Sequence, residues 1–115
     1  MTTVRIREWV MPVSIKGIGR YEVEISGHVE RKDPVKNDAC VAASILAQTL
    51  VQTLRDREGQ FVHYEDKVSD DAYVYILANT DERTDLFLQH AIECIGTGFR
   101  MLETSYPDDF YVDWV

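Results

Sequence analysis

The sequence predicts a two-layer α+β fold, in which two helices pack on a mainly antiparallel four-stranded sheet in the order ββαββα. Apolar residues alternate with a period of two in four short segments, as is typical of half-buried strands. They recur every three to four residues in two longer segments, as is typical of amphipathic helices. A length of 115 residues with 45% hydrophobic content fits a single globular domain over residues 1–115.

The first two strands form a predicted hairpin near the start of the chain. Val4 and Ile6 alternate with charged residues, and the alternation returns at Tyr21, Val23 and Ile25. Proline and glycine lie between the two segments, which favours a turn there. The second strand is expected to end at the Ser-Gly pair that follows, and a charged loop comes next.

The first helix is predicted over about residues 38–58, and Gly59 is expected to end it. One side of this segment carries leucine and alanine at helical spacing: Leu46, Leu50 and Leu54, with Ala43 and Ala47 beside them. This stripe is the face that we expect to pack against the sheet.

The second half of the chain repeats the pattern, with strands predicted over residues 61–68 and 72–78 and a helix over residues 81–104. Gly96 and Gly98 interrupt the helix, where each costs about 1 kcal/mol relative to alanine, so we expect another backbone to approach closely. The helix carries an amphipathic stripe of Leu88, Ile92, Ile95, Phe99 and Leu102. The open, tyrosine-rich face of the sheet suggests burial in a homodimer.

The composition limits the kinds of partner and the cellular compartment that we expect for this protein. Twelve Lys and Arg against twenty Asp and Glu give a net charge of −8. Nucleic-acid binders usually carry a basic footprint, so we expect no nucleic-acid partner, and a basic peptide suits the charge better. No membrane span or signal-peptide core is visible. The cysteines, Cys40 and Cys94, lack the spacing of a disulfide framework. We therefore expect a cytoplasmic protein with reduced thiols.

Cys40 is the first candidate for chemistry. Asn37 and Asp38 are both good helix N-caps, which places Cys40 in the first predicted helical turn. The helix dipole and unpaired backbone N–H groups there lower the pKa of a thiol. His28 follows a strand end and can return to the same sheet edge, which makes a nucleophile–base pair with Cys40. Ser44 lies one turn after Cys40 on the same helix face.

Other interpretations compete with this pair. A cysteine among alanines is often only a small buried hydrophobe. Two histidines and two cysteines also suggest zinc, with ligands His28, Cys40, His90 and Cys94. However, the first two residues lack the tight ligand spacing of zinc sites, so no cofactor or metal is expected. The acidic and aromatic residues 106–115 suit a catalytically silent binding module, an added edge strand or a dimer contact.

A local string favours the catalytic interpretation. Residues 25–28 are Ile-Ser-Gly-His and, after eleven intervening residues, residues 40–44 are Cys-Val-Ala-Ala-Ser. This arrangement resembles the ribosomal-processing cysteine protease family, and the likeness covers residues 21–106. The resemblance implies a ββαββα fold, typically dimeric. It also implies an endopeptidase that removes a short N-terminal extension from a bacterial large-subunit ribosomal protein.

The resemblance assigns roles by matching position. Cys40 would be the nucleophile and His28 the general base, with backbone N–H groups at the helix start as oxyanion donors. Gly27 would keep backbone bulk away from the site, and Ser44 would be a neighbouring polar support. Where the family has an aspartate, this chain has Asn37.

The chain departs from the family's pattern at three places, and these departures affect which substrate we expect it to cleave. Asn37 replaces that aspartate and Asp38 follows it, so either side chain orients the imidazole or caps the helix. The family's glycine-rich loop is replaced by Glu-Arg-Lys-Asp-Pro-Val-Lys over residues 30–36, and Val29 replaces an alanine. A divergent member that processes another precursor, such as a phage structural protein, therefore remains an alternative.

Overall fold

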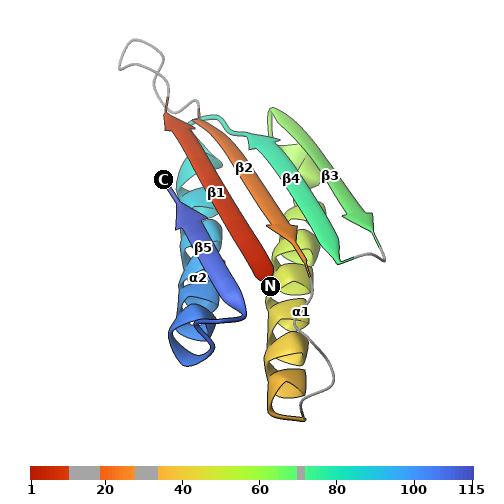
Figure 1. The fold of residues 1–115 in the computed structure, drawn as a ribbon. Helices are drawn as coiled ribbons and strands as arrows, with labels where there is room; N and C mark the ends of the chain where they lie inside the picture. Colours follow the sequence, from red (N-terminus) through yellow and green to blue (C-terminus); the bar gives the residue numbers. More distant parts are fainter. Residues whose placement is uncertain (11–18, 28–33, 70–71) are drawn as a thin grey trace.

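The computed structural model describes residues 1–10, 19–27, 34–69 and 72–115, with the side chains of residues 10 and 34–37 excepted. Five strands, two α-helices and one short 3₁₀ turn follow one another along these segments (Figure 1). In chain order they are β1 (Thr2–Val10), β2 (Gly19–Ser26), α1 (Pro34–Arg55), the 3₁₀ turn (Glu58–Gln60), β3 (His63–Ser69), β4 (Tyr73–Asn79), α2 (Asp85–Ser105) and β5 (Phe110–Trp114).

The strands form one sheet in the order β3-β4-β2-β1-β5. Strands β1 to β4 pair antiparallel, as predicted, but β5 adds a fifth strand that runs parallel to β1. The predicted count of four strands and the order ββαββα are therefore wrong. The alternative of an added edge strand is correct because α2 carries the chain back to the free edge of β1, where Val112 pairs with Val4 (Figure 1).

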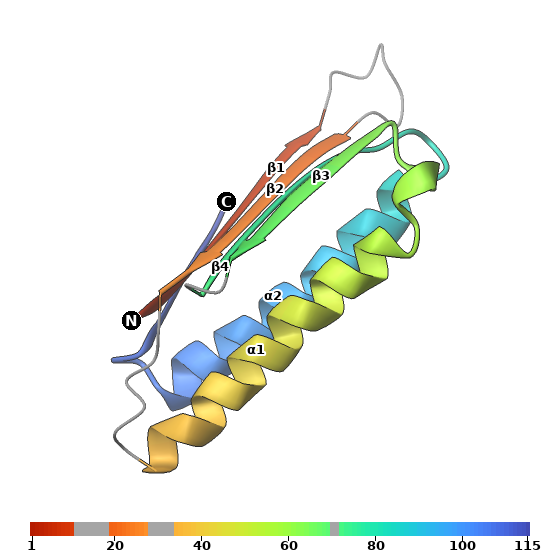
Figure 2. The ribbon, with the colours of Figure 1, turned by 90° about the vertical axis from the view of Figure 1, so that its right-hand side faces the viewer.

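Both helices cover the same face of the sheet, which gives the predicted two layers (Figure 2). The period-two residues of the strands and the helical stripes meet between these layers, as expected from the sequence. The largest fully buried side chains are Tyr21, Phe99, Phe110, Ile6, Leu50, Leu54, Ile76, Leu88, Ile92, Val4, Val23 and Thr80. Neither described helix contains a segment long and apolar enough to cross a membrane.

Side chains, rather than another backbone, occupy the space beside the two helical glycines. A Cβ atom on Gly96 would lie 2.6 Å from the ring of Trp114, and one on Gly98 would lie 2.9 Å from Leu46. Gly96 therefore makes room for β5, and Gly98 makes room for α1. The expectation of a close backbone approach is wrong, although the need for small residues at these positions is correct.

The helix boundaries differ from the predicted ones. Helix α1 ends at Arg55, so Gly59 lies in the following 3₁₀ turn and does not end the helix, contrary to the prediction. Helix α1 begins at Pro34, a residue well suited to the first helical position because its fixed φ is helical and its missing N–H needs no partner there. Before α2, the Asp81 carboxylate accepts hydrogen bonds from the backbone N–H groups of Arg83 and Thr84. This local turn delays the regular helix to Asp85.

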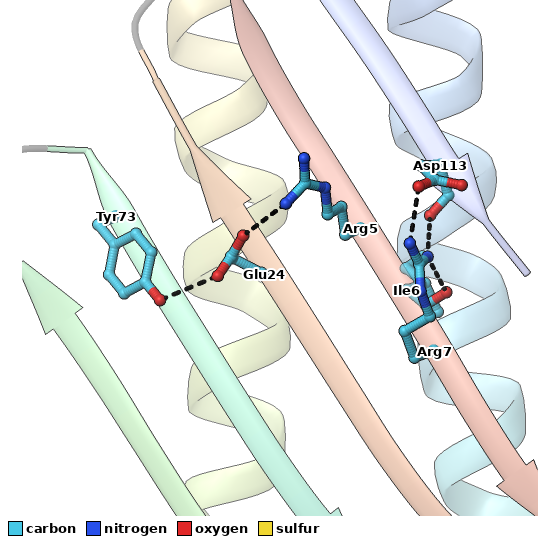
Figure 3. A network of polar contacts seen from close by, with 6 residues as sticks. All are labelled: Arg5, Ile6, Arg7, Glu24, Tyr73 and Asp113. Carbon is cyan, nitrogen blue, oxygen red and sulfur yellow. Dashed lines mark hydrogen bonds and ion pairs between the residues drawn. The ribbon is translucent and has the colours of Figure 1, made fainter.

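The open face of the sheet is held by polar contacts across the strands (Figure 3). Tyr73 donates a hydrogen bond to Glu24 at 3.1 Å, and Arg5 lies 3.6 Å from the same carboxylate. Arg7 donates to the Asp113 carboxylate at 2.7 Å, which ties β1 to β5. The tyrosine-rich face is therefore also a charged face.

Candidate active site

Cys40 lies on α1 at the wall of a cavity of about 300 Å³. The thiol is partly buried and belongs to neither a disulfide nor the fully buried core. The cavity is lined by the ends of β1 and β2, by one face of α1, and by the β3–β4 hairpin. Its lining residues are Thr2, Ile25, Gly27, Cys40, Ala43, Ser44, Ala47, Gln48, Val68, Ser69, Ala72, Tyr73 and Val74. A small-residue helix face and an aliphatic sheet edge thus leave room for a ligand beside the thiol.

The residue at which α1 begins determines how close Cys40 lies to the helix N-terminus and its dipole. Because α1 begins at Pro34, Cys40 is its seventh residue rather than part of its first turn, contrary to the prediction. At a rise of ~1.5 Å per residue, the helix N-terminus is about 9 Å away. A backbone N–H this far into a helix bonds to the carbonyl four residues earlier. The unpaired N–H groups expected beside the thiol, and their role as oxyanion donors, are therefore not available at Cys40.

Gly27 joins three chain segments at the mouth of the cavity. Its φ of +98° is in the region that favours glycine, and a Cβ atom there would collide with the carbonyl oxygen of Met1. Its N–H donates to the carbonyl of Ala72 at 3.2 Å, and its carbonyl accepts from Thr2 Oγ1 at 3.4 Å. The strand that leads to His28 is thus pinned to β1 and to the β3–β4 turn.

Ser44 lies one helical turn beyond Cys40 and lines the same cavity. It is exposed and accepts a hydrogen bond at 3.3 Å from the side-chain amide of Gln48, which lies one further turn along α1. Cys40, Ser44 and Gln48 therefore form a polar row along a helix face that is otherwise made of alanines. A bound chain can meet this row along its length.

His28, Asn37 and Asp38 complete the set of residues expected at the site. His28 lies outside the described residues, directly after Gly27, and the side chain of Asn37 is likewise outside them. Asp38 is exposed on α1 and is not among the residues that line the cavity. Because α1 begins at Pro34, neither Asn37 nor Asp38 occupies the N-cap. The prediction that they cap the helix is wrong for this reason.

Sequence reasoning missed the wall that the β3–β4 hairpin contributes. Val68, Ala72 and Val74 line the cavity opposite α1. Strand β4 pairs with β2 so that Tyr73 lies beside Ser26, which brings the hairpin turn to the strand end that precedes His28. This wall follows from the pairing of β4 with β2. That pairing depends on the order of the strands in the sheet, which local periodicity does not show. Ala72 has a φ of +56°, a left-handed conformation that is uncommon for alanine.

Tyr73 connects the cavity to the open face of the sheet. Tyr73 is among the residues that line the cavity, and its hydroxyl donates to Glu24 on the open face (Figure 3). Desolvation and this bond to a carboxylate raise the pKa of Tyr73. The hydroxyl therefore stays protonated at neutral pH and acts as a donor rather than as a base.

Comparisons with known proteins identify the fold. No family model matches the chain, and neither does any curated protein. Among solved structures, the ribosomal processing protease Prp from S. aureus in complex with a substrate peptide matches with a TM-score of 0.68 and 14% identity over 100% of both chains. The chain has the fold of Prp. The same Prp with a covalently linked product peptide matches with a TM-score of 0.67, 15% identity and the same full coverage of both chains.

A protein from Streptococcus mutans, SMU.848, shares the Prp fold with this chain. It has 22% identity and a TM-score of 0.66, with 100% of this chain and 94% of the other covered. The match extends over the whole chain and so includes β5, the strand beyond the predicted ββαββα order. A divergent Prp-like chain therefore fits the structural findings, in agreement with the resemblance of residues 25–44.

The second cysteine of this Prp-like chain lies away from the cavity. Cys94 is exposed on α2, one turn after the exposed His90. His63, on the edge strand β3, is exposed with Nε2 3.5 Å from Glu65, as expected of a surface residue. Within the described segments, no three His, Cys, Asp or Glu side chains gather in a way that could hold a metal ion.

Proposed function

We propose that this protein is a cysteine endopeptidase that removes a short N-terminal extension from the precursor of a bacterial large-subunit ribosomal protein. The observation that supports this most is the Cys40 thiol at the wall of a cavity of about 300 Å³ in a chain with the Prp fold. Cys94, the other thiol, is exposed on α2 and is not among the residues that line this cavity.

The proposed reaction has two halves. His28 takes the thiol proton of Cys40, and the sulfur attacks the scissile carbonyl carbon while the carbonyl electron pair moves to oxygen. The C–N bond then breaks, His28 donates the proton to the leaving amine, and a thioester remains. In the second half, His28 takes a proton from water, the hydroxide attacks the thioester, and the sulfur leaves and is protonated again.

The covalent product complex of S. aureus Prp supports a nucleophilic mechanism. A covalent link to a product peptide requires a nucleophile, and Cys40 is the residue of that kind that matches the family's motif in this chain. Because the start of α1 is remote from the thiol, activation of Cys40 depends on His28 rather than on the helix dipole. Asn37 and Asp38 remain candidates for orienting that imidazole.

The proposal extends to the compartment and the assembly. Ribosomal protein precursors are made in the cytoplasm, where the reducing environment keeps thiols free. We therefore place the activity in the cytoplasm. The family that residues 25–44 resemble is typically dimeric, so we also propose a homodimer.

Cleavage of a precursor peptide tests the proposal directly. We expect Cys40→Ala to abolish cleavage of a peptide that spans the N-terminal extension of the ribosomal protein, while Cys94→Ala, the matched control, keeps wild-type activity. Mass spectrometry of the products measures both. Cleavage by Cys40→Ala would contradict the mechanism, and loss of cleavage in a folded Cys94→Ala protein would mean that the other thiol is the nucleophile.

A second measurement distinguishes the proposed function from its alternatives. At neutral pH we expect Cys40 to react with iodoacetamide faster than Cys94, because His28 can take the thiol proton of Cys40. Peptide mass spectrometry measures each rate. An activated Cys40 with no cleavage of the ribosomal peptide would favour another precursor, such as a phage structural protein. An unreactive Cys40 together with inactivity would favour a silent ribosome-associated binding module.

A further inference from the structure

Two tyrosines of β4 form equivalent hydrogen bonds with two glutamates of β2 on the open face of the sheet. The Tyr73 hydroxyl donates to Glu24 at 3.1 Å. The Tyr75 hydroxyl donates to Glu22 at 2.9 Å. In the backbone register Tyr73 lies opposite Ser26, so its bond to Glu24 is diagonal across the two strands. Diagonal neighbours in an antiparallel pair lie within reach of aromatic side chains, and a bond between them opposes sliding of one strand along the other.

The Tyr73 pair adjoins the proposed active site, and the Tyr75 pair does not. Tyr73 and the residue before it, Ala72, both line the cavity of about 300 Å³, whereas Tyr75 is not among its lining residues. The Ala72 carbonyl accepts a hydrogen bond of 3.2 Å from the backbone N–H of Gly27. His28, the proposed general base, follows Gly27 directly in the chain. The Tyr73 hydroxyl therefore holds the residue next to the one that bonds this strand end.

Both ends of the hydrogen bond between Gly27 and Ala72 have a left-handed backbone conformation. The φ of Gly27 is +98°, which glycine adopts freely, and the φ of Ala72 is +56°, which is uncommon for alanine. A residue other than glycine keeps such a conformation only where its surroundings fix it. After Ala72 in the chain, this restraint comes from β4 and from the bond of Tyr73 to Glu24. Loss of the hydroxyl bond therefore weakens the restraint on the carbonyl that accepts from Gly27.

Arg5 contributes less than Tyr73 to holding Glu24. Arg5 lies 3.6 Å from the Glu24 carboxylate, and the two side chains are 56% and 33% exposed (Figure 3). An exposed ion pair of this kind contributes little, because water and salt screen both charges. The Tyr73 hydroxyl lies closer, at 3.1 Å, and a hydrogen bond to an ionised carboxylate is stronger than one between neutral groups. The bond from Tyr73 is therefore the contact whose removal we expect to affect the cavity.

We propose that Tyr73 and Glu24 are positioning residues for the proposed reaction. Their hydrogen bond holds the Ala72 carbonyl against the N–H of Gly27. It thereby fixes the strand end from which the general base, His28, follows. This inference rests on the proposed function, because a general base is needed only if a thiol nucleophile acts. The hydroxyl and the carboxylate lie on the open face, away from the helices (Figure 3), so they act through the backbone of β4 and not on the substrate.

Removal of the Tyr73 hydroxyl alone tests the proposal in the intact protein. We expect Tyr73→Phe to lower kcat for the precursor peptide by about three- to tenfold, the factor that corresponds to one hydrogen bond, and to change KM by less than about twofold. Alkylation of Cys40 by iodoacetamide at neutral pH should slow by a similar factor. The matched control is Tyr75→Phe, which removes an equivalent hydroxyl bond on the same strand and the same face. It should leave both rates unchanged.

Variants of Glu24 test whether the acceptor acts through the same bond. Glu24→Ala should reproduce the effect of Tyr73→Phe, whereas Glu24→Gln keeps an oxygen acceptor and should retain at least about half of the wild-type kcat. Glu24→Ala combined with Tyr73→Phe should lower kcat no further than the single variants do, because the effects of residues in contact are not additive. Arg5→Gln should change kcat little, since its contact with Glu24 is a weak ion pair. An additive loss in the double variant would overturn the proposal.

Hydrogen exchange at the Gly27 amide tests the positioning without reference to catalysis. This amide is the donor to Ala72, so we expect its exchange, followed by NMR, to be about three- to tenfold faster in Tyr73→Phe than in the wild type. Tyr75→Phe should not change it. Urea denaturation should give the two tyrosine variants equal stabilities, so that a difference in kcat or in exchange is not an effect of global stability.

The outcomes separate the positioning role from the proposed function. Unchanged kcat in Tyr73→Phe, equal losses in Tyr73→Phe and Tyr75→Phe, or a lower kcat with unchanged Gly27 exchange would each overturn the positioning role and leave the proposed function intact. Faster Gly27 exchange in Tyr73→Phe alone, in a protein whose wild type never cleaves the precursor peptide, would uphold the hydrogen-bonded connection and remove the proposed function. Dissociation of a dimer in Tyr73→Phe but not in Tyr75→Phe would assign the effect to a subunit interface and overturn the proposal.

Discussion

At the scale of single residues, Gly27 shows how one backbone conformation shapes the site. Its positive φ turns the chain out of β2 at the point where β1, β4 and the cavity meet, directly before His28. The family resemblance assigned Gly27 the role of keeping bulk away from the site. The structure adds that the bulk would meet the residue just before β1, because the nearest atom to an added Cβ is the Met1 carbonyl oxygen.

Substituting Gly27 should therefore destabilise the fold. We expect Gly27→Ala to lower the free energy of unfolding by about 1–3 kcal/mol, because alanine is strained at this φ and its Cβ meets backbone. Urea denaturation measures the change. Gly59→Ala is the control, since nothing lies within 4 Å of a Cβ atom there. Equal stabilities of the two variants would contradict this account of Gly27.

The activation of Cys40 is a second prediction at this scale. Because the thiol lies well inside α1, we expect its reactivity near neutral pH to depend on the imidazole of His28. His28→Ala should slow alkylation of Cys40 by about tenfold or more, in line with the usual effect of a general base. Stopped-flow alkylation with mass spectrometry measures the rate, and Cys94 in the same protein provides the internal reference. An unchanged Cys40 rate would remove His28 as the activator.

At the scale of elements, α1 contacts the sheet by different means along its length. Near Cys40 it packs with small side chains, Ala43 and Ala47, which leave the cavity open. At its other end Arg55 reaches across to Asp66 on β3. This ion pair links the last turn of α1 to the edge strand β3.

The ion pair gives a pH dependence with a definite sign. Hydrogen bonds from Arg55 lower the pKa of Asp66 below its ordinary value of 3.8. A carboxyl with a lowered pKa in the folded state contributes stability above the unfolded-state pKa and loses it as the pH falls through the folded one. We therefore expect Asp66→Asn to be less stable than wild type at neutral pH, with a difference that shrinks below about pH 3.8.

Urea denaturation across this pH range measures the Asp66 effect. Asp108→Asn is the control, because Asp108 is exposed in the turn that precedes β5. A constant difference between Asp66→Asn and wild type at all pH values would show that packing, and not the charge of Asp66, connects α1 to β3.

At the scale of the whole molecule, the two faces of the sheet have opposite characters. One face is buried under α1 and α2, and the other carries the contacts of Arg5, Glu24 and Tyr73 in water (Figure 3). Tyr75 donates to Glu22 at 2.9 Å, and desolvation together with this bond raises the pKa of Tyr75 to about 12. The hydroxyls of Tyr73 and Tyr75 therefore already have partners within one chain.

The predicted homodimer is tested at this scale. We expect light scattering after size-exclusion chromatography to give twice the mass of the chain, with the open face buried between the copies. Leu77→Lys, on that face, should shift the protein toward the monomer because it adds an unpaired charge to the interface. Leu86→Lys, on the opposite layer, should not. A monomer at all concentrations would contradict the dimer, and a dimer insensitive to Leu77→Lys would place its interface elsewhere.

Local patterns in the sequence determined the strand segments β1 to β4, the two helices and their buried stripes, and a candidate nucleophile. These follow from periodicity, which is a property of neighbouring residues. The tertiary structure decided what depends on distant partners. Strand β5 joins β1 because Phe110 is buried in the core there and the partly buried ring of Trp114 packs beside Gly96 of α2. The wall of the cavity opposite Cys40 comes from the pairing of β4 with β2. The order of the strands in a sheet depends on contacts between distant segments, so the spacing of residues along the 115-residue chain does not predict it.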